Sequence, residues 1–286
     1  MPLYDITSKF QNYTYNDNKT ISQALVDLNN TDQLDVDDLQ IQEYLLHEIL
    51  TLFKKALLNK FSADLLFQKN YWSWGFVTLY YSNFYLSQSL NRLKGDFIVR
   101  YGRGMKNIQL NTNDNKYKLI NANSSDNHKK ELEKLRENYA FLLSDITYKT
   151  AIPDDYQVRP FFNESKVRND INYTLKYYQE FDRNFTCGIA INECQESYKS
   201  NTFSHDEFKF LEISDSRFKL IYHLLNNIKG DNANFESKFN ILSDKLSKQL
   251  MYKNHKEYLK YIESIFKQHT FHIPSERIHT QFKGYK

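Results

Sequence analysis

Basic residues at two places in the sequence have the chemistry needed to bind phosphate. The first group surrounds a Gly-Arg-Gly turn and consists of Arg100, Arg103 and Lys106. The second lies in residues 238–286, where ten Lys or Arg stand against four Asp or Glu and alternate with aromatic residues; its candidate contacts are Lys253, Lys256 and Lys260. A basic segment with interleaved aromatic residues can follow a phosphate backbone. The alternative interpretation of residues 238–286 is a solvated helix face with a loose end. The Gly-Arg-Gly turn is not a phosphate loop, because no helix and lysine follow its Gly-x-Gly.

The sequence gives little indication of a metal site or of a redox-active cysteine pair. Cys187 and Cys194 are the only cysteines, and no paired Cys/His spacing accompanies them. The histidines of the C-terminal segment also lack a compact ligand spacing; they are His255, His269, His272 and His279. Because zinc sites need closely spaced ligands, we predict two thiols without a metal, no metal site and no cofactor.

The composition predicts a folded, mostly helical protein. Its 286 residues are 41% apolar and 16% aromatic, which is enough to bury a core. Seven Gly and four Pro are few for a many-stranded fold with frequent tight turns. The net charge of +3 is too small to require a nucleic-acid partner.

The sequence predicts neither a membrane span nor a signal peptide. Residues 71–91 carry no charge, but their Ser, Asn, Gln and Tyr content favours a buried helix in a soluble protein. The N-terminus lacks both a basic region and a continuous apolar stretch. We therefore predict a cytoplasmic protein with no membrane partner.

Hydrophobic periodicity predicts the first two long helices. Residues 1–30 are polar and weakly patterned, which indicates an N-terminal arm. An acidic start and one apolar face then predict a helix that ends near Phe61. The second helix is expected over residues 71–94, with Gly95 as its stop. Because it is apolar on almost every side, we expect three of its aromatic residues to be deeply buried, namely Trp74, Tyr80 and Phe84.

Short β-favouring pieces separated by glycines predict a β-hairpin near residues 97–121. A third helix is expected over residues 128–145 and a fourth over residues 163–181, with Arg168 and Asn169 near the start of the fourth. Two further helical segments follow. The expected organisation is an arm over residues 1–30, a helical bundle with the inserted hairpin over residues 31–182, and a helical extension with a basic tail over residues 183–286.

The second and fourth expected helices resemble the HEPN superfamily (higher eukaryotes and prokaryotes nucleotide-binding). The likeness covers roughly residues 35–181. It consists of an aromatic second helix with a Tyr-Tyr pair and a closing glycine, and an Arg-Asn dipeptide near the start of the fourth. The residues that carry it are Tyr80, Tyr81, Phe84, Gly95, Val167, Arg168, Asn169 and Tyr173. The resemblance implies a mostly α fold: an up-and-down HEPN-like bundle with an inserted β-hairpin and a C-terminal helical extension.

Active members of that superfamily look like metal-independent ribonucleases with an arginine, often an asparagine, then four to six residues and a histidine. A guanidinium can hold the scissile phosphate, while an imidazole exchanges a proton near neutral pH. Arg168 and Asn169 fit the opening, but Tyr173 stands at the first histidine position. A tyrosine is a poor base at pH 7, although its hydroxyl can donate to a phosphate. The resemblance therefore implies an RNA- or nucleotide-binding, catalytically degenerate component of a prokaryotic defence or toxin system, as a homodimer or with a partner protein.

Several alternatives stay open. Arg168, Asn169 and Tyr173 could be a surface charge, a first-turn residue and a packing aromatic. Arg217 and His223 have the arginine–histidine spacing, but Arg217 lacks the following asparagine and chance alone accounts for such a match. The chain could be an active metal-independent endoribonuclease that uses this pair, or that uses Arg168 with a histidine supplied from elsewhere. It could also be a non-catalytic scaffold subunit of a protein complex.

Overall fold

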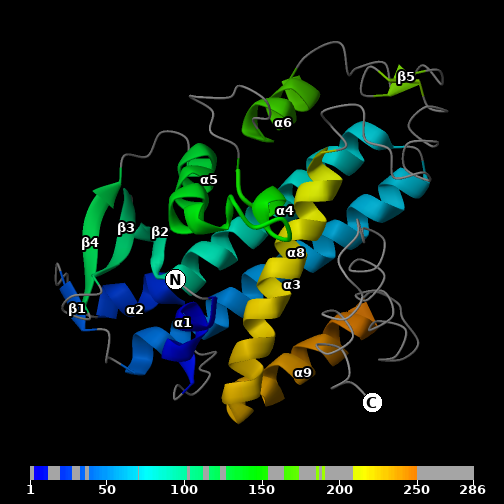
Figure 1. Ribbon diagram of the computed structural model, residues 1–286. Helices are drawn as coiled ribbons and strands as arrows, with labels where there is room; N and C mark the ends of the chain where they lie inside the picture. Colours follow the sequence, from blue (N-terminus) through cyan, green and yellow to red (C-terminus); the bar gives the residue numbers. More distant parts are fainter. Residues whose placement is uncertain are drawn as a thin grey trace.

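The fold is mostly helical with a small antiparallel sheet, as the composition predicts (Figure 1). A computed structural model is the basis of the description. It describes residues 3–11, 20–27, 33–35, 39–69, 71–101, 104–111, 116–122, 127–153, 164–173, 185–186, 189–190 and 209–249. Among the described helices, none combines the length and the apolarity needed to cross a membrane.

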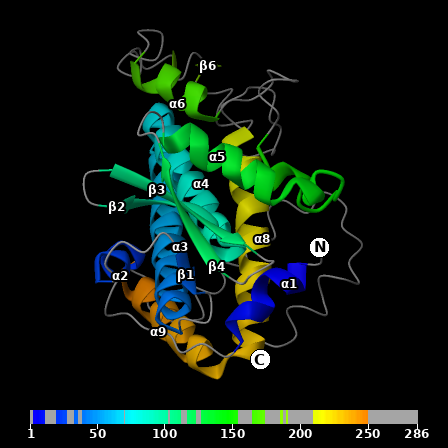
Figure 2. The ribbon, with the colours of Figure 1, turned by 90° about the vertical axis from the view of Figure 1, so that its left-hand side faces the viewer.

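Two long helices, α3 (Leu39–Gln68) and α4 (Trp72–Lys94), lie side by side at the centre of the molecule (Figures 1 and 2). They approach closely at Gly75, where an added Cβ would lie 2.3 Å from the Phe67 ring. The predicted end of the first long helix near Phe61 is wrong. The helix continues because Ala63 and Phe67 are buried in a cluster shared with α4.

The predicted second helix is confirmed, together with its stop. Gly95 adopts a left-handed conformation with φ of 87°, and its N–H donates to the carbonyls of Asn91 and Arg92. Glycine favours this conformation at a helix end because it has no Cβ. The prediction that Trp74 is buried is wrong, since Trp74 is 59% exposed whereas Trp72 is 1% exposed. Two residues correspond to about 200° around a helix, so the two indoles face opposite sides.

The sheet follows α4 and has the strand order β1-β4-β3-β2, with every pair antiparallel. Its strands are β1 (Gln33–Asp35), β2 (Asp96–Tyr101), β3 (Gly104–Asn111) and β4 (Lys116–Ala122). The region expected as one hairpin therefore forms three strands, and β1 joins from far upstream. Phe97, Ile108 and Tyr117 are buried and belong to the main core.

The two ends of the described chain both enter the main core. The described helices of the N-terminal segment are α1 (Leu3–Thr7), the 3-10 helix η1 (Ser8–Phe10) and α2 (Ile21–Asp27). The expectation of a polar arm missed their apolar residues, because Ile6, Phe10 and Leu25 are buried in that core. Residues 209–249 form α8 (Lys209–Asp231) and α9 (Ala233–Gln249).

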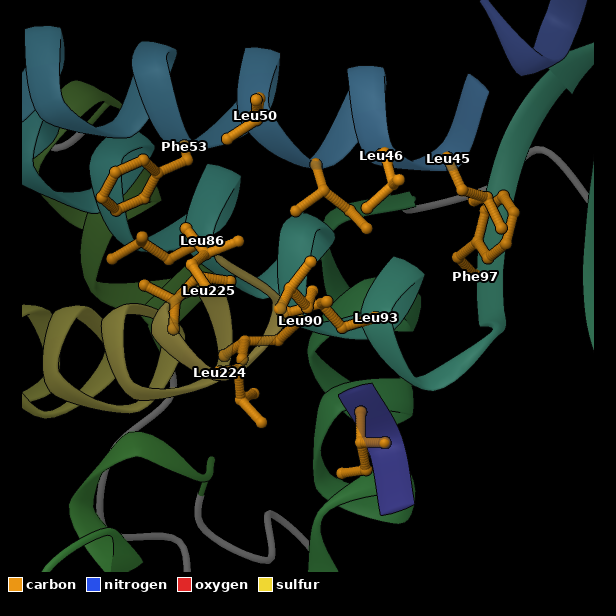
Figure 3. Close-up of a cluster of buried hydrophobic side chains, with 14 of the residues drawn as sticks. Leu45, Leu46, Leu50, Phe53, Leu86, Leu90, Leu93, Phe97, Leu224 and Leu225 are labelled. Carbon is orange, nitrogen blue, oxygen red and sulfur yellow. The ribbon is translucent and has the colours of Figure 1, made fainter. Parts of the chain in front are cut away.

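Helix α8 belongs to the expected C-terminal extension, but it packs on the helix pair of the expected bundle. Leu224 and Leu225 lie beside Leu86 and Leu90 of α4 in the close-up of the core (Figure 3). This part of the expected C-terminal extension is therefore packed directly on the central helix pair.

The remaining described elements are short, and several of them pack against α4 or α8. They are α5 (Asn127–Asn138), the 3-10 helices η2 (Ala140–Leu142) and η3 (Lys149–Ala151), α6 (Glu164–Tyr173), and the two-residue strands β5 (Phe185–Thr186) and β6 (Ile189–Ala190). The third expected helix is shorter than predicted and continues as 3-10 turns. The fourth corresponds to α6, and its expected residues 174–181 lie outside the described residues.

Candidate functional site

Helices α4, α5 and α6 bring one arginine and one histidine to the same pair of tyrosines. The guanidinium carbon of Arg168 lies 5.2 Å from the ring centre of Tyr80 and 6.0 Å from that of Tyr81. The His128 ring centre lies 5.8 Å and 6.1 Å from the same two centres. Residues far apart in the sequence thus form one cationic and aromatic cluster, which we call the tyrosine site. It consists of Tyr80, Tyr81, Phe84, His128, Ser165 and Arg168.

The Tyr80 hydroxyl connects the three helices of the tyrosine site. It lies 2.8 Å from Nδ1 of His128 and 3.4 Å from Oγ of Ser165. Tyr80 is 0% exposed, and this burial is the largest cause that raises its pKa to about 12. The nearby Glu164 carboxylate raises the pKa further, whereas the Ser165 hydrogen bond and the Arg168 charge oppose the rise. The hydroxyl therefore keeps its proton near neutral pH.

His128, close to the start of α5, has its ring orientation fixed on two sides. The ring stacks on Phe84, with centroids 4.1 Å apart and an interplanar angle of 25°. Nδ1 is fixed by the Tyr80 hydroxyl. The sequence analysis did not select this histidine as a functional residue. Its only local signal is its place at the start of an expected helix, whereas its partner Tyr80 lies 48 residues earlier.

Arg168 offers an unused hydrogen-bond donor at the tyrosine site. The residue is half-buried, and its Nε is buried without a hydrogen-bond partner among the described residues. A buried donor without an acceptor is costly, so an acceptor on a ligand would remove that cost. Asn169, the next residue, is exposed. Tyr173 ends α6, and its side chain lies outside the described residues.

A buried ion pair with α8 holds the first turn of α6. Arg217 and Glu164 are 0% and 1% exposed. Two guanidinium nitrogens of Arg217 donate to the two carboxylate oxygens of Glu164, at 2.9 Å and 2.6 Å. The same guanidinium donates to the carbonyls of Ala151 at 2.8 Å and Asn83 at 3.3 Å. Because Glu164 precedes Arg168 by one helical turn, this pair positions the arginine of the site.

The alternative pair, Arg217 and His223, is separated by the geometry of α8. The Arg217 guanidinium lies in the interior and bonds to Glu164 and two carbonyls. His223 is half-buried, and its ring centre lies 6.3 Å from that of Tyr148. Burial lowers the pKa of His223. Six residues correspond to about 240° around a helix, so the two side chains leave α8 in different directions.

The structure does not gather the other predicted basic residues into one described site. Arg100 on β2 is exposed, and Nζ of Lys106 on β3 lies 5.8 Å from the Tyr101 ring centre. Lys106 pairs with Val99, so it projects to the opposite face of the sheet from Arg100. Further predicted residues lie outside the described ranges: Arg103, Lys253, Lys256, Lys260, Cys187 and Cys194. Within those ranges, no group of three His, Cys, Asp or Glu could hold a metal ion.

No family model, curated protein or solved structure matches this chain. The resemblance of α4 and α6 to the HEPN superfamily stays a prediction. A guanidinium suits a phosphate, an imidazole can exchange a proton, and tyrosine rings can stack on a base.

Proposed function

We propose that this chain is a HEPN-like component of a prokaryotic defence or toxin system, and that it binds RNA or a nucleotide at the tyrosine site. One observation carries the proposal: Arg168 lies on the Tyr80 and Tyr81 rings, with a buried Nε that lacks an acceptor among the described residues. A phosphate oxygen supplies such an acceptor together with the opposite charge.

The aromatic residues suit the other half of a nucleotide. Tyr81 and His128 are half-buried, so part of each side chain is exposed, and Arg168 lies on the Tyr81 ring. Stacking of a base on an exposed aromatic ring contributes about 1–3 kcal/mol and tolerates any base. A site with one cation and adjacent rings therefore favours a nucleotide over a simple anion. The role in defence, and assembly as a homodimer or with a partner protein, come from the family resemblance of α4 and α6.

Binding of a mixed-sequence RNA and of ATP, measured by filter retention, tests the proposal. Arg168→Ala should weaken RNA binding about tenfold, because the charge-assisted hydrogen bonds to phosphate contribute roughly 1.5–3 kcal/mol. Lys166→Ala, which changes an exposed cation on the same helix, is the matched control and should have a smaller effect. Affinity should also fall with salt, with a slope that reports the number of neutralised phosphates. If no RNA is retained on the filter at about 50 mM salt, the proposal of RNA binding is refuted.

A scaffold role is the second candidate, and a different surface favours it. Leu65, Tyr71 and Trp74 are 45%, 56% and 59% exposed around the turn between α3 and α4. Exposed aromatic groups are typical of protein interfaces. Trp74→Ala should leave RNA retention unchanged under the proposed function. If cellular activity needs Trp74 but not Arg168, the scaffold role is favoured.

A further inference from the structure

Lys9 lies where the N-terminal 3-10 helix η1 meets the end of α4. A Cβ added at Gly95 would lie 3.2 Å from Nζ of Lys9 and 3.1 Å from Cβ of Leu110 on β3. Nζ of Lys9 also lies 5.2 Å from the ring centre of Phe10. The amine is therefore held at a junction of three elements, although the residue is only half-buried and keeps some exposed surface.

The carboxylates on the neighbouring elements do not neutralise this amine. Three of them bind other side chains, in the pairs Asp96 with Lys134, Glu48 with Arg92, and Asp231 with Gln11. Among the described residues, Lys9 has neither a hydrogen bond nor an ion pair, and the charge that acts on it is that of Lys94. Two amines of like charge thus lie near each other at the end of α4.

This environment favours the neutral form of the amine. Burial lowers the pKa of Lys9 to about 7, and the Lys94 charge contributes to the decrease. At about pH 7.5, only about one amine in a thousand is neutral in an ordinary lysine, whereas a pKa of about 7 leaves most of the amine neutral. Only a neutral amine has a lone pair with which to attack carbon, so Lys9 is a nucleophile at a pH where other lysines are protonated.

We propose that Lys9 is a modification site at which dissolved carbon dioxide adds reversibly to Nζ and forms a carbamate. The nitrogen lone pair forms a bond to the carbon atom, and one pair of C–O bonding electrons moves onto oxygen as the negative charge. The amine then releases one proton to water, so no oxidant, reductant or other leaving group is needed. This site is separate from the tyrosine site, and the inference goes beyond the proposed function.

The surroundings of Lys9 favour carbon dioxide over other electrophiles. Carbon dioxide is small and uncharged, whereas a larger acyl donor would have to displace the side chains that half-bury the residue. The product carries a negative charge beside Lys94, so attraction replaces the repulsion between two ammonium groups. Lys94 is therefore the counter-charge that stabilises the carbamate.

Trapping with a trialkyloxonium salt in isotope-labelled bicarbonate, followed by peptide mass spectrometry, examines the modification directly. Alkylation converts the labile carbamate into a stable ester, and the peptide map separates Lys9 from the α-amino group and from other lysines. At about pH 7.5, label at Lys9 should exceed label at Lys55 by at least about tenfold. Lys55 is the internal control, because it is exposed and its Nζ also lies over an aromatic ring, 5.6 Å from the centre of Tyr85.

Variants separate the amine from its surroundings. Lys9→Met should lose the label at position 9, and Lys55→Met should keep it. Lys9→Arg retains the positive charge and a long side chain, but its guanidinium stays protonated and should not be labelled. Bicarbonate should raise the unfolding temperature of the wild type and not that of Lys9→Arg, because only the folded wild type forms this carbamate.

Lys94→Met examines the counter-charge. At about pH 9 the amine of Lys9 is neutral with or without Lys94, so the label reports the stability of the carbamate itself. The variant should then carry about two- to fivefold less label at Lys9, as expected for loss of a partly exposed ion pair. Equal labelling would overturn the role of Lys94.

The mapping of the wild type decides the proposal even if a variant fails to fold. Label at Lys9 that stays no higher than at Lys55 overturns it, and so does a bicarbonate effect on stability that is unchanged in Lys9→Arg. Neither measurement involves RNA, so failure here is distinguishable from failure of the proposed function.

Discussion

Replacing Glu164 with glutamine tests whether α8 holds α6 in place through the buried ion pair. The Arg217 guanidinium has no exposed surface and donates to both carboxylate oxygens and to two carbonyls. Glu164→Gln removes the compensating charge but nearly preserves the shape. Loss of one partner from a buried pair typically costs about 3–5 kcal/mol, because the remaining charge stays in the interior. We expect a loss near the lower end of that range, since the amide oxygen still accepts one hydrogen bond.

Urea unfolding followed by tryptophan fluorescence measures this loss. With a slope of about 1–3 kcal/mol per molar urea, the midpoint should fall by about 1–3 M. The double variant Glu164→Leu with Arg217→Met should be more stable than Glu164→Gln, because an apolar pair leaves no buried charge. The control is Glu133→Gln, whose ion pair with Lys129 is 3.7 Å long and about half exposed; it should change stability by less than about 1 kcal/mol. If Glu164→Gln changes stability as little as this control does, the pair does not hold α6, and the positioning of Arg168 needs another cause.

Two further predictions concern packing and pH. In the same assay, Trp72→Ala should lower the free energy of unfolding by about 3–5 kcal/mol and Trp74→Ala by less than about 0.5 kcal/mol. The reason is that the Trp72 side chain is 1% exposed whereas Trp74 is 59% exposed. Equal losses would contradict the described orientation of α4. Burial, and secondarily the nearby Lys94 charge, lower the pKa of Lys9 from 10.5 to about 7 in the folded protein. Between pH 7 and pH 10.5 the unfolded chain therefore binds more protons at Lys9 than the folded protein does. Stability should therefore rise with pH from about 7 towards 10.5, by up to about 1.4 kcal/mol per pH unit, and Lys9→Met should remove that contribution. A pH profile that is the same in both proteins would show that Lys9 does not titrate in this way.

Local signals allowed the correct prediction of α4. Its uncharged aromatic run and the glycine that follows it depend only on neighbouring residues, and the structure places its ends within a residue of the expectation. The predicted end of α3 near Phe61 was wrong, because the helix continues to Gln68. What extends that helix is the packing of Phe67 on α4, which sequence periodicity does not reveal.

Residues brought together over long distances were beyond a reading of the sequence alone. β1 pairs with β4 across about 80 residues of chain. His128 belongs to the tyrosine site only because Tyr80 on another helix reaches its ring. Arg217 has the spacing of a motif but lies in the interior, where Glu164 neutralises it. Spacing along one helix could not distinguish a buried structural arginine from one beside a ligand.

The contact between the two ends of the described chain has a consequence for synthesis on the ribosome. The carbonyl of Phe10 accepts a hydrogen bond from Asn232, and the core that contains Ile6 also contains Phe235. The helices that emerge first therefore lack their packing partners in the hydrophobic core until α8 and the start of α9 have been synthesised. Until then, α3 and α4 expose apolar surface that chaperones recognise. A stop codon before residue 209 should yield a chain that aggregates, even though every residue of the tyrosine site is encoded upstream of it.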